Sequence, residues 1–283
     1  FAVNGKRVMI DCGLYQGDLF ADDRNREPFA VDPASIDILL VTHAHIDHIG
    51  RIPKFVREGF KGVIYSTPPT KELTEIMLLD TTRILQHEAV QTGREPIYTE
   101  RDVRDTMQLW EVNEYYHPFT LGEELTCEFK DAGHILGSAM MFLTVSGTTM
   151  VFTGDLGNSP SPLLRDTDSI KGATYLLMES VYGDRNHEGR EERQDVLKKL
   201  IVDSIARGGV LMIPAFSIER TQELLFELND MVEHHNIPDV KIFLDSPMAI
   251  RATEVYRRSD KYFNLEARHI IKSGDDVFKF PRL

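Results

Sequence analysis

A short segment crowded with histidine constrains this chain more than any other feature. His43, His45, Asp47 and His48 follow the apolar run 36–41, which has the length and β-branched content of a buried strand. In extended backbone, residues two apart share a face, so these side chains can converge on one or two cations. A polar turn that is rich in histidine by chance is the alternative, but histidine seldom clusters without a ligand role. The segment therefore predicts a metal site at a strand end.

Four other residues occur where apolar, strand-like runs end. They are Asp11, His134, Asp155 and Glu179. Each alone could be a turn residue, but their recurrence at strand ends indicates one shared site. A mixture of imidazole and carboxylate ligands suits Zn²⁺, with Mn²⁺ or Fe less favoured.

Composition indicates a soluble globular chain with one large or two modest domains. The chain has 283 residues, of which 42% are hydrophobic, and no run approaches the roughly 20 apolar residues of a membrane helix. We therefore expect no membrane partner. Cys12 and Cys127 are far apart in sequence, which favours a reducing, cytoplasmic location and two buried thiols over a disulfide.

The formal charge of −13 argues against nucleic-acid binding through bulk electrostatics. Bound cations would offset several carboxylates, and local basic groups could still line a phosphate path. Candidates for such a path are Arg251, Arg257, Arg258, Arg268 and Lys272. A solvated basic face is the alternative reading of these five residues.

Strand-like and helical patterns alternate along the chain, which predicts an α/β or layered α+β fold. Expected strands are 7–11, 36–41, 62–66, 140–145, 149–153, 174–178, 210–214 and 240–245, and expected helices include 69–91 and 217–234. The texture changes after Tyr182, so a domain boundary is expected near residue 186. Both ends lack a closing element, and we interpret the chain as a fragment.

With these residues in place, the chain resembles the metallo-β-lactamase superfamily. The similar motifs are His43-Ala-His45-Ile-Asp47-His48, Ala-Gly-His134-Ile-Leu-Gly-Ser and Thr-Gly-Asp155-Leu-Gly-Asn. More narrowly it resembles the β-CASP RNA-processing nucleases, such as RNase J and the polyadenylation endonuclease. The added motifs begin at Glu179, Pro214 and Leu244, and the resemblance extends from Asp11 to about Phe263.

The resemblance implies a role for each motif residue. His43, His45 and His134 would hold one zinc, Asp47 and His48 the other, and Asp155 would bridge them. Asp11 would orient a ligand imidazole by accepting its ring N–H. Asp47, Asp155 and Glu179 would serve catalysis, although Glu179 could instead be a structural carboxylate. His187 follows the Glu179 motif, and a surface role is expected for it.

The implied fold is an αββα metallo-β-lactamase sandwich over residues 1–185, with an inserted α/β β-CASP domain over 186–283. Both are expected to be incomplete. In the family, a return to the first domain supplies a last metal-binding histidine and a catalytic histidine that protonates the leaving oxygen. These have no counterpart among the 283 residues. We therefore expect a weakened second metal site and little activity from this chain alone.

The implied activity is hydrolysis of single-stranded RNA by a hydroxide that two Zn²⁺ ions activate, with Mn²⁺ as a substitute, leaving a 5′-phosphate. Internal cleavage and cleavage from a 5′ end both stay open, and a homodimer is compatible with the family. Ser217, as a helix cap, and Arg220 would contact substrate phosphate; a capped helix without ligand is the alternative. Other readings are a small-molecule ester or thioester hydrolase, a DNA nuclease and a non-catalytic RNA-processing scaffold.

Overall fold

The chain separates into two compact units. The computed structural model describes residues 1–17, 21–185, 193–234 and 237–283. The first unit comprises Phe1–Ser159 and Asp166–Met178, and the second comprises Pro160–Arg165 and Glu179–Leu283. The boundary expected near residue 186 and the side chain of His187 lie outside the described residues. In the described parts of the chain, no helix has the length and apolar character needed to cross a membrane.

The first sheet of unit 1 is mixed and has the order β1-β2-β3-β4-β5. Its strands are β1 (Ala2–Val3), β2 (Lys6–Ile10), β3 (Ile38–Leu40), β4 (Val63–Ser66) and β5 (Trp110–Val112). Strands β2 to β5 pair in parallel, and β1 pairs antiparallel with β2. Because the carboxyl ends of parallel strands meet at one edge, residues that follow β2, β3 and β4 come together there.

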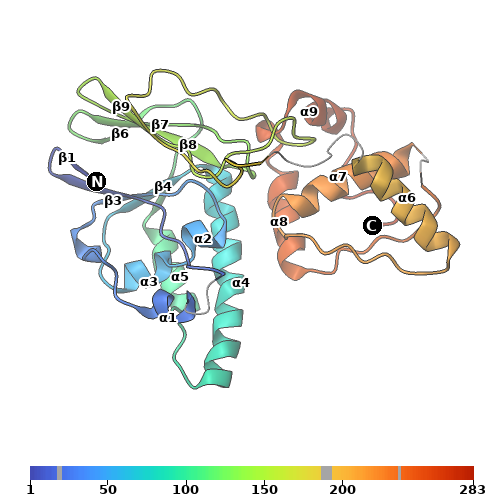
Figure 1. The fold of residues 1–283 in the computed structure, drawn as a ribbon, viewed down its shortest axis with the longest axis horizontal. Coiled ribbons are helices and arrows are strands. Elements are labelled where there is room, and N and C mark those ends of the chain that lie inside the picture. The colour runs from blue at the N-terminus through green and yellow to red at the C-terminus, as the bar shows by residue number, and fades with distance from the viewer. Residues whose placement is uncertain (18–20, 186–192, 235–236) are drawn as a thin grey trace. The chain divides into compact units, whose positions relative to one another are not determined.

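Helices cover one face of this sheet (Figure 1). They are α1 (Ala21–Arg26), the 3₁₀ turn η1 (Pro33–Ser35), α2 (Ile46–Ile49), α3 (Ile52–Arg57), α4 (Pro68–Thr92) and α5 (Glu100–Gln108). The helix expected over 69–91 is thus confirmed as α4. In the core between these helices and the sheet, Leu39 of β3 packs with Ile49, Phe55, Leu78 and Val103 from four helices. Parallel strands buried in this way read as continuous apolar runs, as 38–41 does.

The second sheet of unit 1 has the order β10-β9-β8-β7-β6. Its strands are β6 (Phe119–Gly122), β7 (Leu125–Asp131), β8 (Ala139–Val145), β9 (Thr148–Phe152) and β10 (Tyr175–Leu177). The two sheets face each other: the rings of Tyr65 and Phe119 lie 5.2 Å apart, and the Ala139 N–H donates to the Thr42 carbonyl. The expected α/β class, with two sheets in one domain, is confirmed.

The second unit is helical in its described part. It contains α6 (Arg193–Ala206), α7 (Arg220–Glu233), α8 (Pro247–Arg257), η2 (Asp260–Tyr262) and α9 (Leu265–Lys272). Tyr256, Phe263 and Phe278 form an aromatic cluster with ring centroids 6.1 to 6.3 Å apart.

The strands expected over 210–214 and 240–245 are wrong, since neither segment is a strand in the structure. Val210 and Met212 are 89% and 85% exposed. An apolar run becomes a strand only where a neighbouring strand supplies ladder hydrogen bonds, and no strand pairing is found for either segment in the described residues.

Candidate metal centre

The candidate centre is built where β3 ends and α2 begins. Residues 41–44 are fully buried, and His45 is the N-cap of α2 in extended conformation (φ −72°, ψ 147°). Asp47 and His48 therefore lie on the first turn of a helix, while His43 and His45 lie on the extended segment before it. This change of backbone type divides the motif into two pairs of side chains.

Four side chains converge into one group of potential ligands. His43, His45, His134 and Asp155 each offer a ligand atom, and these atoms all lie within 4.8 Å of one another. The Nδ1 atom of His45 is 3.1 Å from Nε2 of His43 and 3.1 Å from Nε2 of His134. Three imidazoles and a carboxylate at this spacing fit a Zn²⁺-type donor set. We call these four residues the first ligand group.

A second ligand group, Asp47, His48 and Asp155, lies beside the first. His48 Nε2 is 3.4 Å from Oδ1 of Asp155 and 3.9 Å from Oδ2 of Asp47. The other oxygen of Asp155, Oδ2, lies 3.9 Å from His43 Nε2 and 3.7 Å from His134 Nε2. Asp155 thus presents one oxygen to each group, as a carboxylate shared between two cations would.

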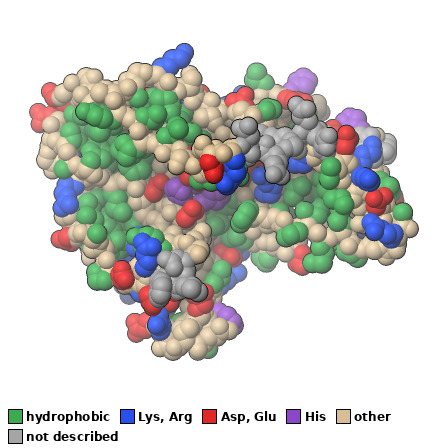
Figure 2. All heavy atoms as spheres, in the orientation of Figure 1, with side chains coloured by type: hydrophobic (Ala, Val, Ile, Leu, Met, Phe, Trp, Pro, Cys, Tyr) green, Lys and Arg blue, Asp and Glu red, His purple; other side chains and the backbone are tan. Residues whose placement is uncertain are grey.

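The surface of this region is open to solvent on one side. His43 is completely buried, whereas the side chain of Asp47 is 49% exposed. Figure 2 shows histidine side chains reaching the drawn face next to acidic side chains. The ligand groups are therefore accessible to solvent from the Asp47 side, and His43 lies at their buried end.

Burial and crowding keep three of the imidazoles neutral. Burial, followed by the nearby His48, His45 and His134, lowers the pKa of His43 well below its usual range. Burial and His134 lower the pKa of His45 to about 4, and burial lowers the pKa of His134 as well. A neutral imidazole is the form that binds a metal, so the residues of the first ligand group fit a divalent cation.

His48 differs from the other imidazoles. Burial alone would lower its pKa, but hydrogen bonds with Asp11 and Asp155 outweigh burial and raise the pKa to about 10. The same hydrogen bond from His48 lowers the pKa of Asp155. Without a bound cation, His48 and Asp155 therefore form an ion pair near neutral pH, and a cation in the second ligand group would replace the proton on Nε2.

Asp11 connects the ends of β2 and β3 to the centre. Its Oδ2 accepts hydrogen bonds from His48 Nδ1 and the Thr42 hydroxyl, both at 2.7 Å, and its Oδ1 accepts the Thr42 N–H at 2.8 Å. The Thr42 hydroxyl also lies 3.0 Å from His43 Nδ1. Asp11 itself has a left-handed backbone (φ 56°), which aspartate tolerates better than most residues.

Gly13 allows this loop to lie directly against α2. A Cβ atom built on Gly13 would lie 1.5 Å from the carbonyl oxygen of Asp47, so no other residue fits without moving the backbone. The Cys12 N–H donates to the His48 carbonyl at 2.7 Å. The loop after β2 thus fixes the backbone of the second ligand group.

The His134 loop is held from the N-terminus of α4. Gly137, which has a left-handed backbone (φ 83°), presents its carbonyl to the hydroxyls of Thr67 at 2.6 Å and Thr70 at 2.9 Å. The Ser138 hydroxyl accepts the His134 N–H at 3.0 Å. Sequence reasoning missed Thr67 and Thr70, although Thr-Pro-Pro-Thr at a helix start indicates a capped N-terminus.

Three predicted site residues belong to the second unit. Glu179 is half-buried there. Ser217 does not cap α7: its hydroxyl lies 3.5 Å from that of Ser246, and the N-cap is Glu219, so this prediction is wrong. Ser217 is the first of three turn residues, and the helix begins only at Arg220. Arg220 donates to Glu223 at 2.8 Å.

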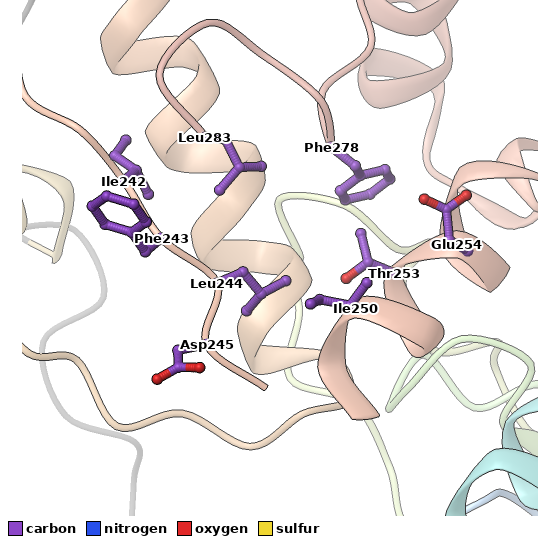
Figure 3. Close-up of a pocket in the computed structure, with 9 residues that line it drawn as sticks. All are labelled: Ile242, Phe243, Leu244, Asp245, Ile250, Thr253, Glu254, Phe278 and Leu283. Carbon is purple, nitrogen blue, oxygen red and sulfur yellow. The ribbon is translucent and has the colours of Figure 1, made fainter. Parts of the chain in front are cut away.

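The second unit also contains an open cavity of about 460 Å³. Figure 3 shows Leu244, Ile250 and Leu283 turned toward the same space. The walls include two carboxylates, Asp245 and Glu254, and no basic side chain. This lining does not favour a phosphate group.

The chain matches two protein-family models and is similar to several known proteins. The family model of the metallo-beta-lactamase superfamily matches residues 1–201, and that of the Beta-Casp domain matches residues 221–283. "Ribonuclease TTHA0252" of Thermus thermophilus is 37% identical over 97% of the chain and 61% of its own length. The "RNase J-like protein" of Methanocaldococcus jannaschii is 33% identical over 96% of the chain and 60% of its length.

A plant relative is also similar. "Cleavage and polyadenylation specificity factor subunit 3-I" of Arabidopsis thaliana is 29% identical over 97% of the chain and 39% of its length. The chain therefore spans between 39% and 61% of the length of these three relatives. The chain belongs to the metallo-beta-lactamase superfamily, with a Beta-Casp segment after its metallo-beta-lactamase region.

Proposed function

We propose that this chain is the catalytic region of a metal-dependent ribonuclease that hydrolyses phosphodiester bonds in single-stranded RNA. The observation that carries the proposal is Asp155, which presents one oxygen to each of two adjacent ligand groups. Paired cations are the usual means of in-line phosphodiester hydrolysis. The names of two relatives, a ribonuclease and an RNase J-like protein, favour RNA as the substrate.

Two Zn²⁺ ions are the proposed cofactors, with Mn²⁺ as a substitute. His43, His45 and His134 would hold one ion, Asp47 and His48 the other, and Asp155 both. Bound ions would supply Lewis acidity and a water of lowered pKa. Mixed imidazole and carboxylate donors at these spacings support zinc over magnesium, which prefers oxygen ligands alone.

The chain's own residues would perform the remaining steps. Asp11 accepts a hydrogen bond from the Nδ1–H of His48, and this contact directs Nε2 toward Asp155 and the second ligand group. Asp47, whose side chain is half-exposed, and Asp155 would accept a proton from the attacking water. Burial of His43 excludes water from the floor of the centre.

Residues of the second unit are proposed to assist. Glu179 would help to move protons or orient a catalytic imidazole, and Ser217 and Arg220 would contact substrate phosphate. The Arg220 side chain is 52% exposed, which supports access to a ligand even though it pairs with Glu223. A reducing, cytoplasmic location agrees with the free, buried thiols of Cys12 and Cys127.

Metal content and nuclease activity test the proposal together. The chain and its His45→Ala variant would be loaded with zinc, dialysed and analysed for metal per chain. We expect one firmly held equivalent and a second, more weakly held one in the parent, and loss of the firmly held equivalent in the variant, because His45 contacts both other imidazoles of the first ligand group. No bound metal in the parent would favour a non-catalytic scaffold.

Matched single-stranded RNA and DNA oligonucleotides, each labelled at the 3′ end, would then be incubated with the zinc-loaded protein. We expect weak cleavage of RNA by this chain alone, products that carry a 5′-phosphate, and loss of that cleavage in the His45→Ala variant. Preferential cleavage of DNA would contradict the proposed substrate, and hydrolysis of small esters without any nuclease activity would favour a small-molecule hydrolase.

A further inference from the structure

A cluster of aromatic and cationic side chains lies in the loop region after β2 and has no role in the site described so far. The Arg51 guanidinium carbon lies 4.5 Å from the ring centroid of Tyr15 and 5.1 Å from that of Phe29. The guanidinium carbon of Arg24 lies 3.9 Å from the Tyr15 centroid. Tyr15 is 40% exposed, so this cluster is accessible to a ligand.

The position of Tyr15 is fixed by a buried amide. The Tyr15 N–H donates to Oδ1 of Asn25 at 2.8 Å, and Nδ2 of Asn25 donates to the Tyr15 carbonyl at 3.0 Å. Asn25 is 5% exposed. A reciprocal pair of hydrogen bonds from a buried side chain holds the Tyr15 backbone in place before any ligand arrives, which lowers the entropic cost of binding.

Backbone hydrogen bonds connect this cluster to the metal centre. The Cys12 N–H donates to the His48 carbonyl at 2.7 Å, and the Arg51 N–H donates to the Cys12 carbonyl at 2.9 Å. Tyr15 follows Cys12 by three residues, which span at most roughly 10 Å of chain. Tyr15 and Arg51 are therefore close along the chain to residues whose backbone is hydrogen-bonded to that of the second ligand group.

Arg51 keeps donors that a phosphate could use. Its Nε donates to the Gly13 carbonyl at 2.8 Å, and across the described stretches of the chain it has no carboxylate partner. The acidic side chains of α1, Asp22 and Asp23, bind Arg94 instead. A guanidinium held by its Nε and by two rings presents its outer N–H groups in a fixed plane, which suits bidentate contact with phosphate.

We propose that Tyr15, Arg24 and Arg51 form a nucleotide-binding subsite that holds the phosphate and base of a single-stranded RNA residue adjacent to the cleaved bond. Arg51 supplies the phosphate contact, Tyr15 the aromatic surface for the base, and Arg24 a second cation beside the ring. The inference rests on the proposed ribonuclease function and adds to it the residues that hold the strand. In a chain of net charge −13, such a local cationic group would direct the strand to the centre.

Binding of labelled single-stranded RNA, measured by fluorescence anisotropy at several salt concentrations with chelator present to prevent cleavage, tests the subsite. Each phosphate contact contributes about 0.7 to the slope of log affinity against log salt for a single strand. Arg51→Gln should therefore lower the slope by about 0.7 and weaken binding about tenfold. Arg51→Lys should keep the slope but not the full affinity, since it retains the charge and loses the planar fork.

Two further variants separate stacking and general charge from the phosphate contact. Tyr15→Leu should weaken binding about fivefold or more without changing the slope, because the ring carries no charge. Arg104→Gln on α5 removes the same charge from a side chain that is 64% exposed, and should change neither quantity.

The outcomes distinguish the subsite from the ribonuclease itself. If the zinc-loaded parent cleaves RNA but Arg51→Gln binds with the parent's affinity and slope, the subsite is overturned and the ribonuclease stands. An equal loss of slope in Arg104→Gln would also overturn it, since the effect would then be one of net charge. If the parent neither binds nor cleaves RNA, both proposals fail. Should Arg51→Gln not fold, the slope and affinity of Arg51→Lys decide.

Discussion

Asp11 and His48 are 37 positions apart in sequence, and their side chains meet at 2.7 Å, Oδ2 to Nδ1. This contact fixes which ring nitrogen of His48 faces the centre, because Nδ1 is engaged and Nε2 is left 3.4 Å from Asp155. Parallel pairing of β2 with β3 brings Asp11 to the same sheet edge as the histidine segment. The orientation of a ligand in the second group therefore depends on a residue outside the motif.

Replacing Asp11 by asparagine should weaken the second ligand group. The new amide could still face His48, but without the negative charge the pKa of His48 should fall and its ring should be less basic and less well oriented. We expect the second cation to bind about 10- to 100-fold more weakly, with the first little affected. A competition titration against a chelator measures both affinities. Asp37→Asn, which removes a carboxylate at the other end of β2, is the control; equal losses in both variants would contradict this role.

Replacing Gly13 by alanine should displace α2. The new Cβ would overlap the Asp47 carbonyl oxygen, so the backbone must move, at a cost of about 1–3 kcal/mol in the free energy of unfolding. We expect one zinc equivalent to be lost, since Asp47 and His48 lie on that helix. Gly172→Ala, which meets no atom within 4 Å, should keep its full metal content despite its own left-handed backbone. Full metal content in Gly13→Ala would show that the loop adapts.

Replacing Thr67 by valine should loosen the His134 loop. The hydroxyl caps α4 and also donates to Gly137, so its loss should cost about 1–2 kcal/mol of stability. Because Gly137 lies three residues after His134, we also expect weaker binding of the first cation. Thr82→Val removes a hydroxyl that bonds only within α4 and serves as the control. If both variants bind zinc like the parent, α4 does not position His134.

The stability of the metal-free protein should peak near pH 6.5. His45 has a pKa of about 4 in the fold, below its unfolded value of 6.5, so the unfolded chain binds the proton first and stability falls as the pH drops below about 6.5. His48 has a pKa of about 10, so its contribution is complete below 6.5 and is lost as the pH rises toward 10. Urea unfolding across this range, with chelator present, measures the profile. A His48→Gln variant should lack its share of the alkaline decline, and an unchanged decline would contradict the assignment.

Metal binding should release an imidazole proton only at the second ligand group. At about pH 7.5, His43, His45 and His134 are neutral and His48 is charged, so the first cation should displace no proton from an imidazole and the second should displace the proton of His48, in addition to any proton that a metal-bound water releases. Calorimetric titration with zinc in two buffers of different ionisation enthalpy gives the number released. The His48→Gln variant should release about one proton fewer than the parent, and equal release from the parent and the variant would mean that another group supplies the proton.

Much of the fold followed from local patterns. The run 36–41 contains β3, and the helix expected over 69–91 is α4, because periodic apolar residues and a capped start act within the segment itself. Sequence reasoning failed where the structure of a segment depends on a neighbouring element of the fold. The segments 210–214 and 240–245 have strand-like composition without a paired strand, and Ser217 precedes turn residues that no local pattern revealed.

The types of ligand could be predicted from the order of amino acids alone, since imidazoles and carboxylates at alternate positions after an apolar run have few other uses. How these ligands divide into two groups depends on the tertiary structure. Asp155 faces both groups, Asp11 raises the pKa of His48, and Thr67 holds the loop of His134. Each of these relationships joins residues from different strands or helices. Spacing along the chain cannot encode them, because distances and burial between separate elements are set only when the sheets and helices pack.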